Sequence, residues 1–252
     1  YAEYFQKKDS IFMIKRAVAI SVVENDSTFI HGDTLLVTGK KDHRVIRSYN
    51  NVKIFKKDLQ GKCDSLYTDQ STGITKMYVN PILWSDQSQI TGDSIKLLSN
   101  KETEKLDSLK ILGNSFIIQK DSIDPEIFNQ IKGRNMFGKF IKNQLKTLLV
   151  KGNGEAVNFN RNDEGVMETI TKQFCSNIEF ELIDSEINQI KCLKMSDGKT
   201  YPPSMYPEND KRLKGFLWRE SEQPKKKEDI FEKKVKANKK TGKNKLLRAK
   251  EN

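Results

Sequence analysis

The sequence predicts an all-β protein built from stacked antiparallel strand repeats. Short β-branched or aromatic runs recur along the chain, and clusters of Gly, Asp, Asn and Ser separate them. Helical periodicity is nearly absent before residue 125. Two sequence landmarks also return at a regular spacing, which indicates one structural unit repeated along the chain.

The expected strands are short runs that fit a pleated, half-buried surface. The clearest of them cover residues 20–23, 34–38, 51–55, 82–84 and 95–98. A last strand, carrying Trp218, is expected over residues 213–219.

The first landmark is a glycine, followed in three of its copies by an aspartate. It occurs at Gly32-Asp33, Gly61 with Asp64, Gly92-Asp93 and Gly133. The second landmark is an asparagine, which follows each glycine by 19 to 22 residues at Asn51, Asn80, Asn114 and Asn153. Gly permits a positive φ or a close backbone approach, and Asp can accept hydrogen bonds from turn amides. We therefore expect Gly32, Asp33, Gly61, Asp64, Gly92, Asp93 and Gly133 to be structural turn residues.

The positive charge is concentrated at the C-terminus. The net charge is +11, but residues 225–252 alone hold 12 Lys or Arg and 4 Asp or Glu, so the rest of the chain is nearly balanced. This distribution argues against a nucleic-acid-binding body. It predicts one folded domain over residues 1–222 and a basic, disordered tail over residues 223–252.

The cysteines Cys63, Cys175 and Cys192 match no metal-binding spacing. Cys175 and Cys192 either pair across a hairpin or stay small buried residues, and the sequence leaves both readings open. No run approaches the roughly 18 apolar residues of a membrane span. The chain starts at Tyr1 without a visible leader, so we expect a mature or excised piece.

Catalytic constellations are not apparent. His31 and His43 are the only histidines, and no nucleotide-binding glycine loop occurs. Asp33, Asp64 and Asp93 recur one per unit, without the density of a calcium loop. We therefore expect no enzyme activity, no cofactor and no metal.

These residues resemble the OstA-like family of periplasmic lipopolysaccharide-transport proteins. The resemblance rests on Gly32-Asp33-Thr34-Leu35, Gly92-Asp93-Ser94-Ile95, Asn51-Val52 and Gly113-Asn114, and covers roughly residues 10–160. It implies an open, taco-like β-jellyroll whose apolar groove carries the acyl chains of lipid A toward the outer membrane. It also implies a periplasmic location, with association with the outer membrane as a further expectation. The implied partners are lipopolysaccharide, homologous β-jellyroll domains joined by strand addition, and further copies of the chain stacked head to tail.

The resemblance implies that some apolar strand residues line the lipid groove. Without the resemblance, such residues would be expected to form an ordinary hydrophobic core. The candidates are Val52, Ile54, Ile82, Trp84, Ile95, Leu97, Phe116 and Ile118. The alternation around residues 80–84 is ambiguous, because Leu83 is apolar as well as its two neighbours.

Two other functions remain open from the sequence. One is a structural β-solenoid, a scaffold or adhesin-like protein with its interior packed shut. The other is a β-helix enzyme acting on polysaccharide, which single aspartates at turns do not favour. For assembly, the segment 11–23 is expected to be an edge available for pairing, whereas Pro202, Pro203 and Pro207 interrupt pairing at the other end.

Overall fold

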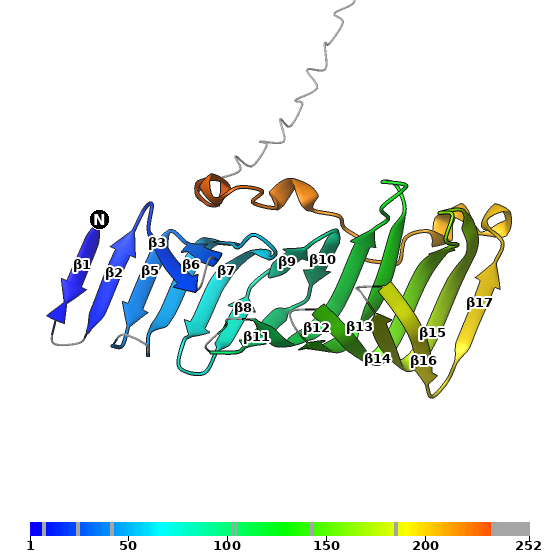
Figure 1. The fold of residues 1–252 in the computed structure, drawn as a ribbon, viewed down its shortest axis with the longest axis horizontal. Helices are drawn as coiled ribbons and strands as arrows, with labels where there is room; N and C mark the ends of the chain where they lie inside the picture. Colours follow the sequence, from blue (N-terminus) through cyan, green and yellow to red (C-terminus); the bar gives the residue numbers. More distant parts are fainter. Residues whose placement is uncertain are drawn as a thin grey trace, which may run out of the picture.

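The computed structural model describes residues 1–6, 9–23, 26–40, 43–101, 103, 105–141, 144–183 and 186–232. They form one antiparallel sheet of 17 strands, with no α-helix and only short 3-10 turns in this part of the chain. The strands stand side by side along the long axis of the molecule (Figure 1). The all-β prediction is confirmed.

The sheet is folded into two layers. The first layer contains β1 (Ala2–Phe5), β2 (Ser10–Ile14), β5 (Thr34–Thr38), β8 (Ile74–Tyr78), β11 (Ser94–Ser99) and β16 (Glu186–Leu193). The second layer contains β3 (Val18–Val23), β4 (Asp26–His31), β9 (Ile82–Ser85), β10 (Ser88–Thr91) and β17 (Asp197–Tyr201). Six longer strands pass through both layers: β6 (Val45–Phe55), β7 (Gln60–Asp69), β12 (Leu106–Lys120), β13 (Phe128–Ile141), β14 (Gln144–Arg161) and β15 (Met167–Ile183).

The line along which the chain passes from one layer to the other is called the crease. On β6, β12 and β14 the crease consists of two consecutive residues with positive φ: Asn50 and Asn51, Gly113 and Asn114, and Gly152 and Asn153. The strand pairing shifts register at these positions. An extra residue of this kind bends a strand and adds twist, so the asparagine landmark marks the bend.

The glycine landmark has a different structural role at the crease. The φ angles of Gly32, Gly92 and Gly133 lie outside the left-handed region, but a Cβ on them would lie 2.0 Å from Ser48 Oγ, 2.5 Å from Ile111 Cγ2 and 2.3 Å from Val150 Cγ1. A side chain at these positions would collide with Ser48, Ile111 or Val150 unless those side chains moved, which explains the glycine. Gly61 instead lies inside the second layer, and Asp64 takes the crease position of that unit, with its N–H bonded to Val79 O.

Side-chain hydrogen bonds join neighbouring chain passages along the crease. Asn51 Nδ2 donates to Asp33 Oδ2 at 2.6 Å, and Asn114 Nδ2 donates to Asp93 Oδ1 at 3.0 Å. Asn177 Oδ1 accepts from the backbone N–H of Gly152 at 3.0 Å. The first two bonds connect the aspartate and the asparagine landmarks of the units that begin at Gly32 and Gly92.

The C-terminal segment differs from the expectation. The strand predicted over residues 213–219 does not form, and that prediction was wrong. Residues 202–232, here called the strap, instead run back from β17 across the strands toward β6, with 3-10 turns at Pro203–Met205, Glu208–Asp210, Glu220–Glu222 and Lys227–Phe231 (orange in Figure 1). The strap stays packed on the sheet beyond residue 222, since Ile230 is only 2% exposed.

Candidate functional site

The space between the two layers is filled by one large apolar cluster, called the interior cluster. It takes Leu66, Met77, Ile95, Ile111 and Met136 from the first layer. From the second layer it takes Ile30, Ile54, Leu83 and Ala156, with Ile90, Ile117 and Ile131 partly buried against it. Apolar contact is therefore continuous between the layers from β4 to β15.

The candidate groove residues divide between the two faces of the sheet. Val52, Ile54, Ile95 and Leu97 belong to the interior cluster. Phe116 and Ile118 belong to a second cluster, which also contains Tyr206 and Leu213 of the strap. Ile82 and Trp84 are Cα partners of Lys62 and Gln60 and share the outer face with Phe116 and Ile118, whereas Leu83 lies in the interior cluster.

The ambiguity in the sequence has a physical cause. Ile82, Leu83 and Trp84 are all at most 1% exposed, because the second layer is covered on both faces over β9 and β12. Strands buried on both faces read as continuous apolar runs rather than as alternating ones. The run therefore indicated a covering layer outside the sheet, a feature that sequence reasoning missed.

One row of residues across the outer face holds the strap. Successive Cα partners in this row, called the glutamine row, are Phe55, Gln60, Trp84, Gln89, Ile118, Gln130, Val157 and Lys172. Glutamine alternates with an apolar residue from Gln60 to Gln130. The apolar members give the strap a surface to pack on, and the amides give it hydrogen bonds.

Two glutamines bind the strap backbone in the same way. Gln130 Nε2 donates to Lys211 O at 2.7 Å, while its Oε1 accepts from the N–H of Leu213 at 2.8 Å. Gln89 repeats this pattern with Leu217 O at 2.7 Å and the N–H of Arg219 at 2.6 Å. Each glutamine side chain forms hydrogen bonds with two backbone groups of the strap that have no partner in a strand. The strap can therefore be buried without pairing as a strand of the sheet.

Polar anchors hold the two ends of the strap. At its start, Lys172 Nζ lies 2.9 Å from Asp210 Oδ1. At its end, Lys53 Nζ donates to Asp229 O at 2.7 Å and Glu232 O at 2.8 Å. Phe231 packs edge-on against buried His31, with ring centroids 5.0 Å apart, and Arg16 Cζ stacks 4.2 Å from its centroid.

Ion pairs in the middle of the strap shift the pKa of Glu222. The hydrogen bond from Arg219, at 2.7 Å, and then the bond from Lys62 stabilise the carboxylate more than partial burial destabilises it. Together they lower the pKa of Glu222 to about 2. Nearby, Trp218 Nε1 donates to Glu220 Oε2 at 3.2 Å.

Aromatic side chains fill the junction between strap and sheet. Phe128 packs against Phe216 and Trp218 with ring centroids 5.3 and 5.1 Å apart. The Arg212 guanidinium stacks on both phenylalanine rings at 4.6 Å. Such cation–π and edge contacts add to the apolar burial, so this junction is a strong point of attachment.

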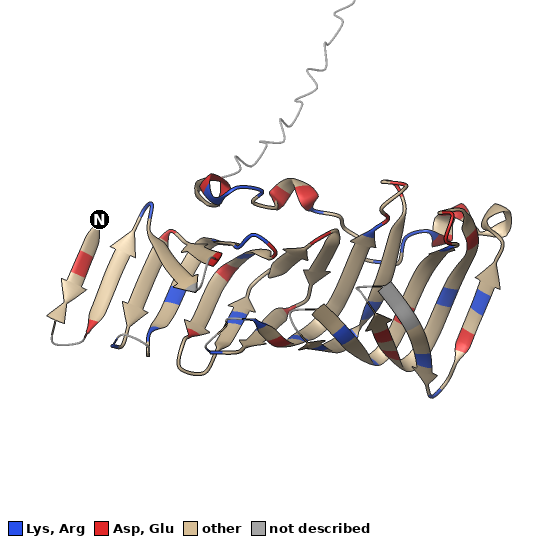
Figure 2. Ribbon diagram, in the orientation of Figure 1, with Lys and Arg blue, Asp and Glu red and all other residues tan. Residues whose placement is uncertain are grey.

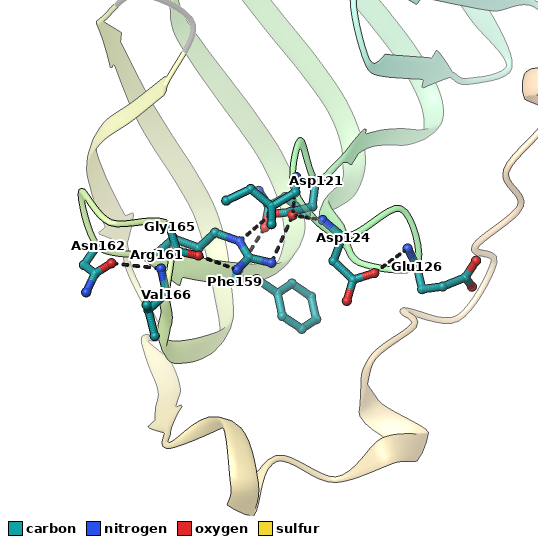
Figure 3. Close-up of polar contacts among 10 residues, drawn as sticks. Asp121, Asp124, Glu126, Phe159, Arg161, Asn162, Gly165 and Val166 are labelled. Carbon is teal, nitrogen blue, oxygen red and sulfur yellow. Dashed lines mark hydrogen bonds and ion pairs between the residues drawn. The ribbon is translucent and has the colours of Figure 1, made fainter.

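A half-buried ion pair joins two loops at the rim of the second layer (Figure 3). Arg161 Nε and Nη2 each lie 3.0 Å from a carboxylate oxygen of Asp121, and Arg161 Nη1 donates to Gly165 O at 2.7 Å. Burial alone would raise the pKa of Asp121, but the Arg161 bonds and the N–H groups of Asp124 and Ile123 outweigh it, so the pKa is lowered. Both carboxylate oxygens of Asp121 accept hydrogen bonds from within the protein, which indicates a structural role for this ion pair.

The three cysteines and His31 occupy structural positions. Cys175 and Cys192 form a disulfide that joins β15 to β16, with the Cα atoms 5.7 Å apart. Cys63 is a free, buried thiol in the interior cluster, and burial raises its pKa to about 12. His31 Nδ1 lies 2.6 Å from Ala17 O. Within the described ranges, no group of three or more His, Cys, Asp or Glu side chains is placed to hold a metal ion.

No family model matches the chain, and no curated protein matches it. A solved structure that matches is the crystal structure of LptH, the LptA-homologous periplasmic component of the lipopolysaccharide transport device from Pseudomonas aeruginosa. The identity is 14%, the TM-score is 0.42, and the match covers 57% of this chain and 95% of that one. These values do not place the chain in a family. No helix in the described part of the chain has the length and apolarity of a membrane span.

Proposed function

We propose that the protein is a periplasmic carrier of lipopolysaccharide, whose lipid A acyl chains lie between the two layers on the way to the outer membrane. The observation that supports this most directly is the interior cluster, which runs along the molecule between layers joined at the crease. The hairpin turns of the two layers form the side opposite the crease, where a guest would enter. Val52, Ile54, Ile95 and Leu97 are the candidate lining residues in this proposal, together with Leu83.

Acyl chains suit this space because their binding needs no polar hot spot. Burial of methylene groups stabilises the bound state by about 0.8 kcal/mol each, less the cost of ordering the chain. Val52, Met77, Ile111 and Val150 have no exposed surface and belong to one cluster that joins the two layers. Entry of a guest therefore requires the layers to separate, with the crease as the hinge.

The disulfide supports the periplasmic part of the proposal. Disulfide bonds form and persist in oxidising compartments, and they are rare where glutathione and thioredoxin keep thiols reduced. Cys175 and Cys192 are bonded in this chain. This bond therefore supports an extracytoplasmic location.

The ends of the sheet support strand addition as the mode of assembly, with another copy or with a homologous β-domain. β1 pairs with β2 and is exposed along its whole length, with Tyr4 59% and Phe5 42% exposed. Such an edge pairs with other chains unless charge blocks it. Light scattering over a concentration series should show growing assemblies, and Tyr4→Lys should reduce them. A wild-type protein that stays monomeric would refute head-to-tail stacking.

The lipid proposal is tested by photocrosslinking from two adjacent positions. A photoreactive phenylalanine analogue at Ile117 faces the interior cluster, whereas the same group at Phe116 faces the strap side. After incubation with lipopolysaccharide, we expect crosslinks from position 117 and few from position 116. Equal labelling, labelling from 116 alone, or no labelling from 117 would contradict an interlayer site.

A second candidate is a closed structural scaffold. The observation that favours it is the tight contact between the layers, in which Met136 also has no exposed surface. A scaffold would give no crosslink from position 117 under conditions where the protein stays folded, so the same experiment separates the two functions.

A further inference from the structure

We propose that the outer face of the first layer binds a linear acidic polysaccharide along a row of cationic side chains. This face points away from the interior cluster, and the strap lies on the other layer. The proposal goes beyond the carrier function, because it needs no lipid between the layers.

The row follows from the register of five neighbouring strands. Successive Cα partners are Arg47 on β6, Tyr67 on β7, Lys76 on β8, Lys96 on β11 and Lys110 on β12, here called the cation row. The last four are each adjacent in sequence to a member of the interior cluster, so they point to the opposite face. At the usual spacing of strands the cation row is about 19 Å long. Blue segments recur from strand to strand along the lower side of the sheet in Figure 2.

Three lysines of the cation row lie directly opposite one another. Lys76 is the Cα partner of Lys96, and Lys96 is the Cα partner of Lys110. Like charges in directly opposed positions destabilise a sheet, so folding alone gives no reason for this arrangement. Among the residues that the structure describes, no ion pair joins Arg47 or these lysines to an acid. An anionic partner with charges spaced along the row would relieve the repulsion.

The side chains next to the cations leave their charge uncompensated. Arg47 Cζ lies 5.5 Å and Lys76 Nζ lies 5.6 Å from the ring centroid of Tyr67, so the ring sits between two cations. Asp69 lies in an adjoining row, but its Oδ1 accepts hydrogen bonds from the N–H of Ser71 at 2.9 Å and from Ser71 Oγ at 2.6 Å. This carboxylate therefore serves its own turn rather than the cation row.

The positive charge of this face is confined to a line. On the same five strands, the adjoining rows consist of Tyr49, Ser65, Tyr78, Ser94 and Leu112 on one side and of Val45, Asp69, Ile74, Leu98 and Ser108 on the other. Neither of these two rows contains Lys or Arg. A line of charge suits an extended polymer better than a bilayer, whose headgroups form a two-dimensional array.

Hydroxyl groups beside the cations indicate the chemistry of this polymer. Tyr49 and Tyr78 are each 41% exposed, and Ser65 and Ser94 are half-buried. Such groups donate and accept hydrogen bonds, as sugar hydroxyls do, and tyrosine rings offer a flat apolar surface to a sugar ring. A sugar unit in a linear polysaccharide is about as long as the distance between two strands. The disulfide, which supports an oxidising compartment, favours a polysaccharide over a nucleic acid.

Fluorescence anisotropy with labelled oligogalacturonate tests the proposal on the full chain. This ligand carries a carboxylate on every sugar, and its methyl ester is a neutral ligand of the same length. The acid should bind, more weakly as the salt concentration rises, and the ester should not. The triple variant Lys76→Gln, Lys96→Gln and Lys110→Gln should weaken binding about tenfold, because three ion pairs are lost.

A matched control is the triple variant Lys199→Gln, Lys214→Gln and Lys227→Gln, which removes the same charge at exposed positions of β17 and the strap. Residues 225–252 are also basic, so the difference between the two triple variants is the decisive quantity. Equal effects of the two variants, or equal binding of acid and ester, would overturn the proposal. So would binding of single-stranded oligothymidylate of the same charge that is as tight, or binding to phosphatidylglycerol vesicles without binding to the oligosaccharide.

Lys96→Glu supplies a second readout. The new carboxylate would lie opposite Lys76 and Lys110, so the melting temperature should rise by about 2–4 °C. Binding of oligogalacturonate should at the same time fall below that of Lys96→Gln. A lower melting temperature or unchanged binding would overturn the proposal. The oligosaccharide measurements contain no lipid, so their failure is distinct from failure of the carrier proposal.

Discussion

The side-chain oxygen of Gln89 accepts a hydrogen bond from the backbone N–H of Arg219, 130 residues later in the chain, at 2.6 Å. Gln130 makes the equivalent bond to Leu213 at 2.8 Å. Two residues of the glutamine row, one on β10 and one on β13, therefore hold the strap through its backbone. The attachment of the strap should be sensitive to the loss of either side chain.

Gln130→Leu should destabilise the protein by about 2–4 kcal/mol, because Lys211 O and the Leu213 N–H would lose their partners while staying near a buried apolar junction. Urea unfolding followed by circular dichroism measures the loss. Gln144→Leu, at an exposed position of β14, should change stability by less than about 0.5 kcal/mol. Similar losses for both variants would show that the strap bonds contribute nothing specific.

Glu222 should make attachment of the strap dependent on pH. Its pKa in the folded protein, about 2, lies below the ordinary value of 4.5. The stabilisation is therefore complete above pH 4.5 and is lost as the pH falls through about 2. Trp218 fluorescence should report loosening of the strap across this window. Glu222→Gln should loosen the strap already at neutral pH and should remove the change in Trp218 fluorescence over this pH range. An unchanged dependence of the fluorescence on pH would exclude the ion pairs of Glu222 with Lys62 and Arg219 as its cause.

Reduction of the disulfide should lower the free energy of unfolding by about 3 kcal/mol, the chain-entropy value for a loop of this size. The bond links residues 17 positions apart. Unfolding by urea with and without dithiothreitol gives the difference. The double variant Cys175→Ser with Cys192→Ser serves as the control, since dithiothreitol should not change its stability further.

Cys63 should be unreactive in the folded protein. Burial raises its pKa to about 12, so the thiolate that attacks thiol reagents is nearly absent at neutral pH. A chromogenic disulfide reagent should detect no thiol under native conditions and one in denaturant without reductant. Rapid labelling of the native protein would mean that the layers open often enough to expose the interior cluster.

The sequence predicted the strand repeats because its two landmarks are local solutions to bending a strand. Asn51 and Asn114 supply the left-handed backbone, and Gly32 and Gly92 make room for it. The strap could not be predicted in this way, because Leu213 and Trp218 carry no periodicity and their partners lie far away in the chain. The alternation around Ile82 and Trp84 does not identify a face either, because Ile82, Leu83 and Trp84 are all buried.

Attachment of the strap also depends on the register of the strands beneath it. Three of its anchors are glutamines: Gln60 on β7, which accepts a hydrogen bond from Gln223 Nε2 at 2.7 Å, Gln89 on β10 and Gln130 on β13. A slip of one residue in any of these strands would turn its glutamine toward the interior and present an apolar side chain to the strap. The strap can therefore dock fully only where β7, β10 and β13 are in register, so its attachment depends on the correct pairing of these three strands.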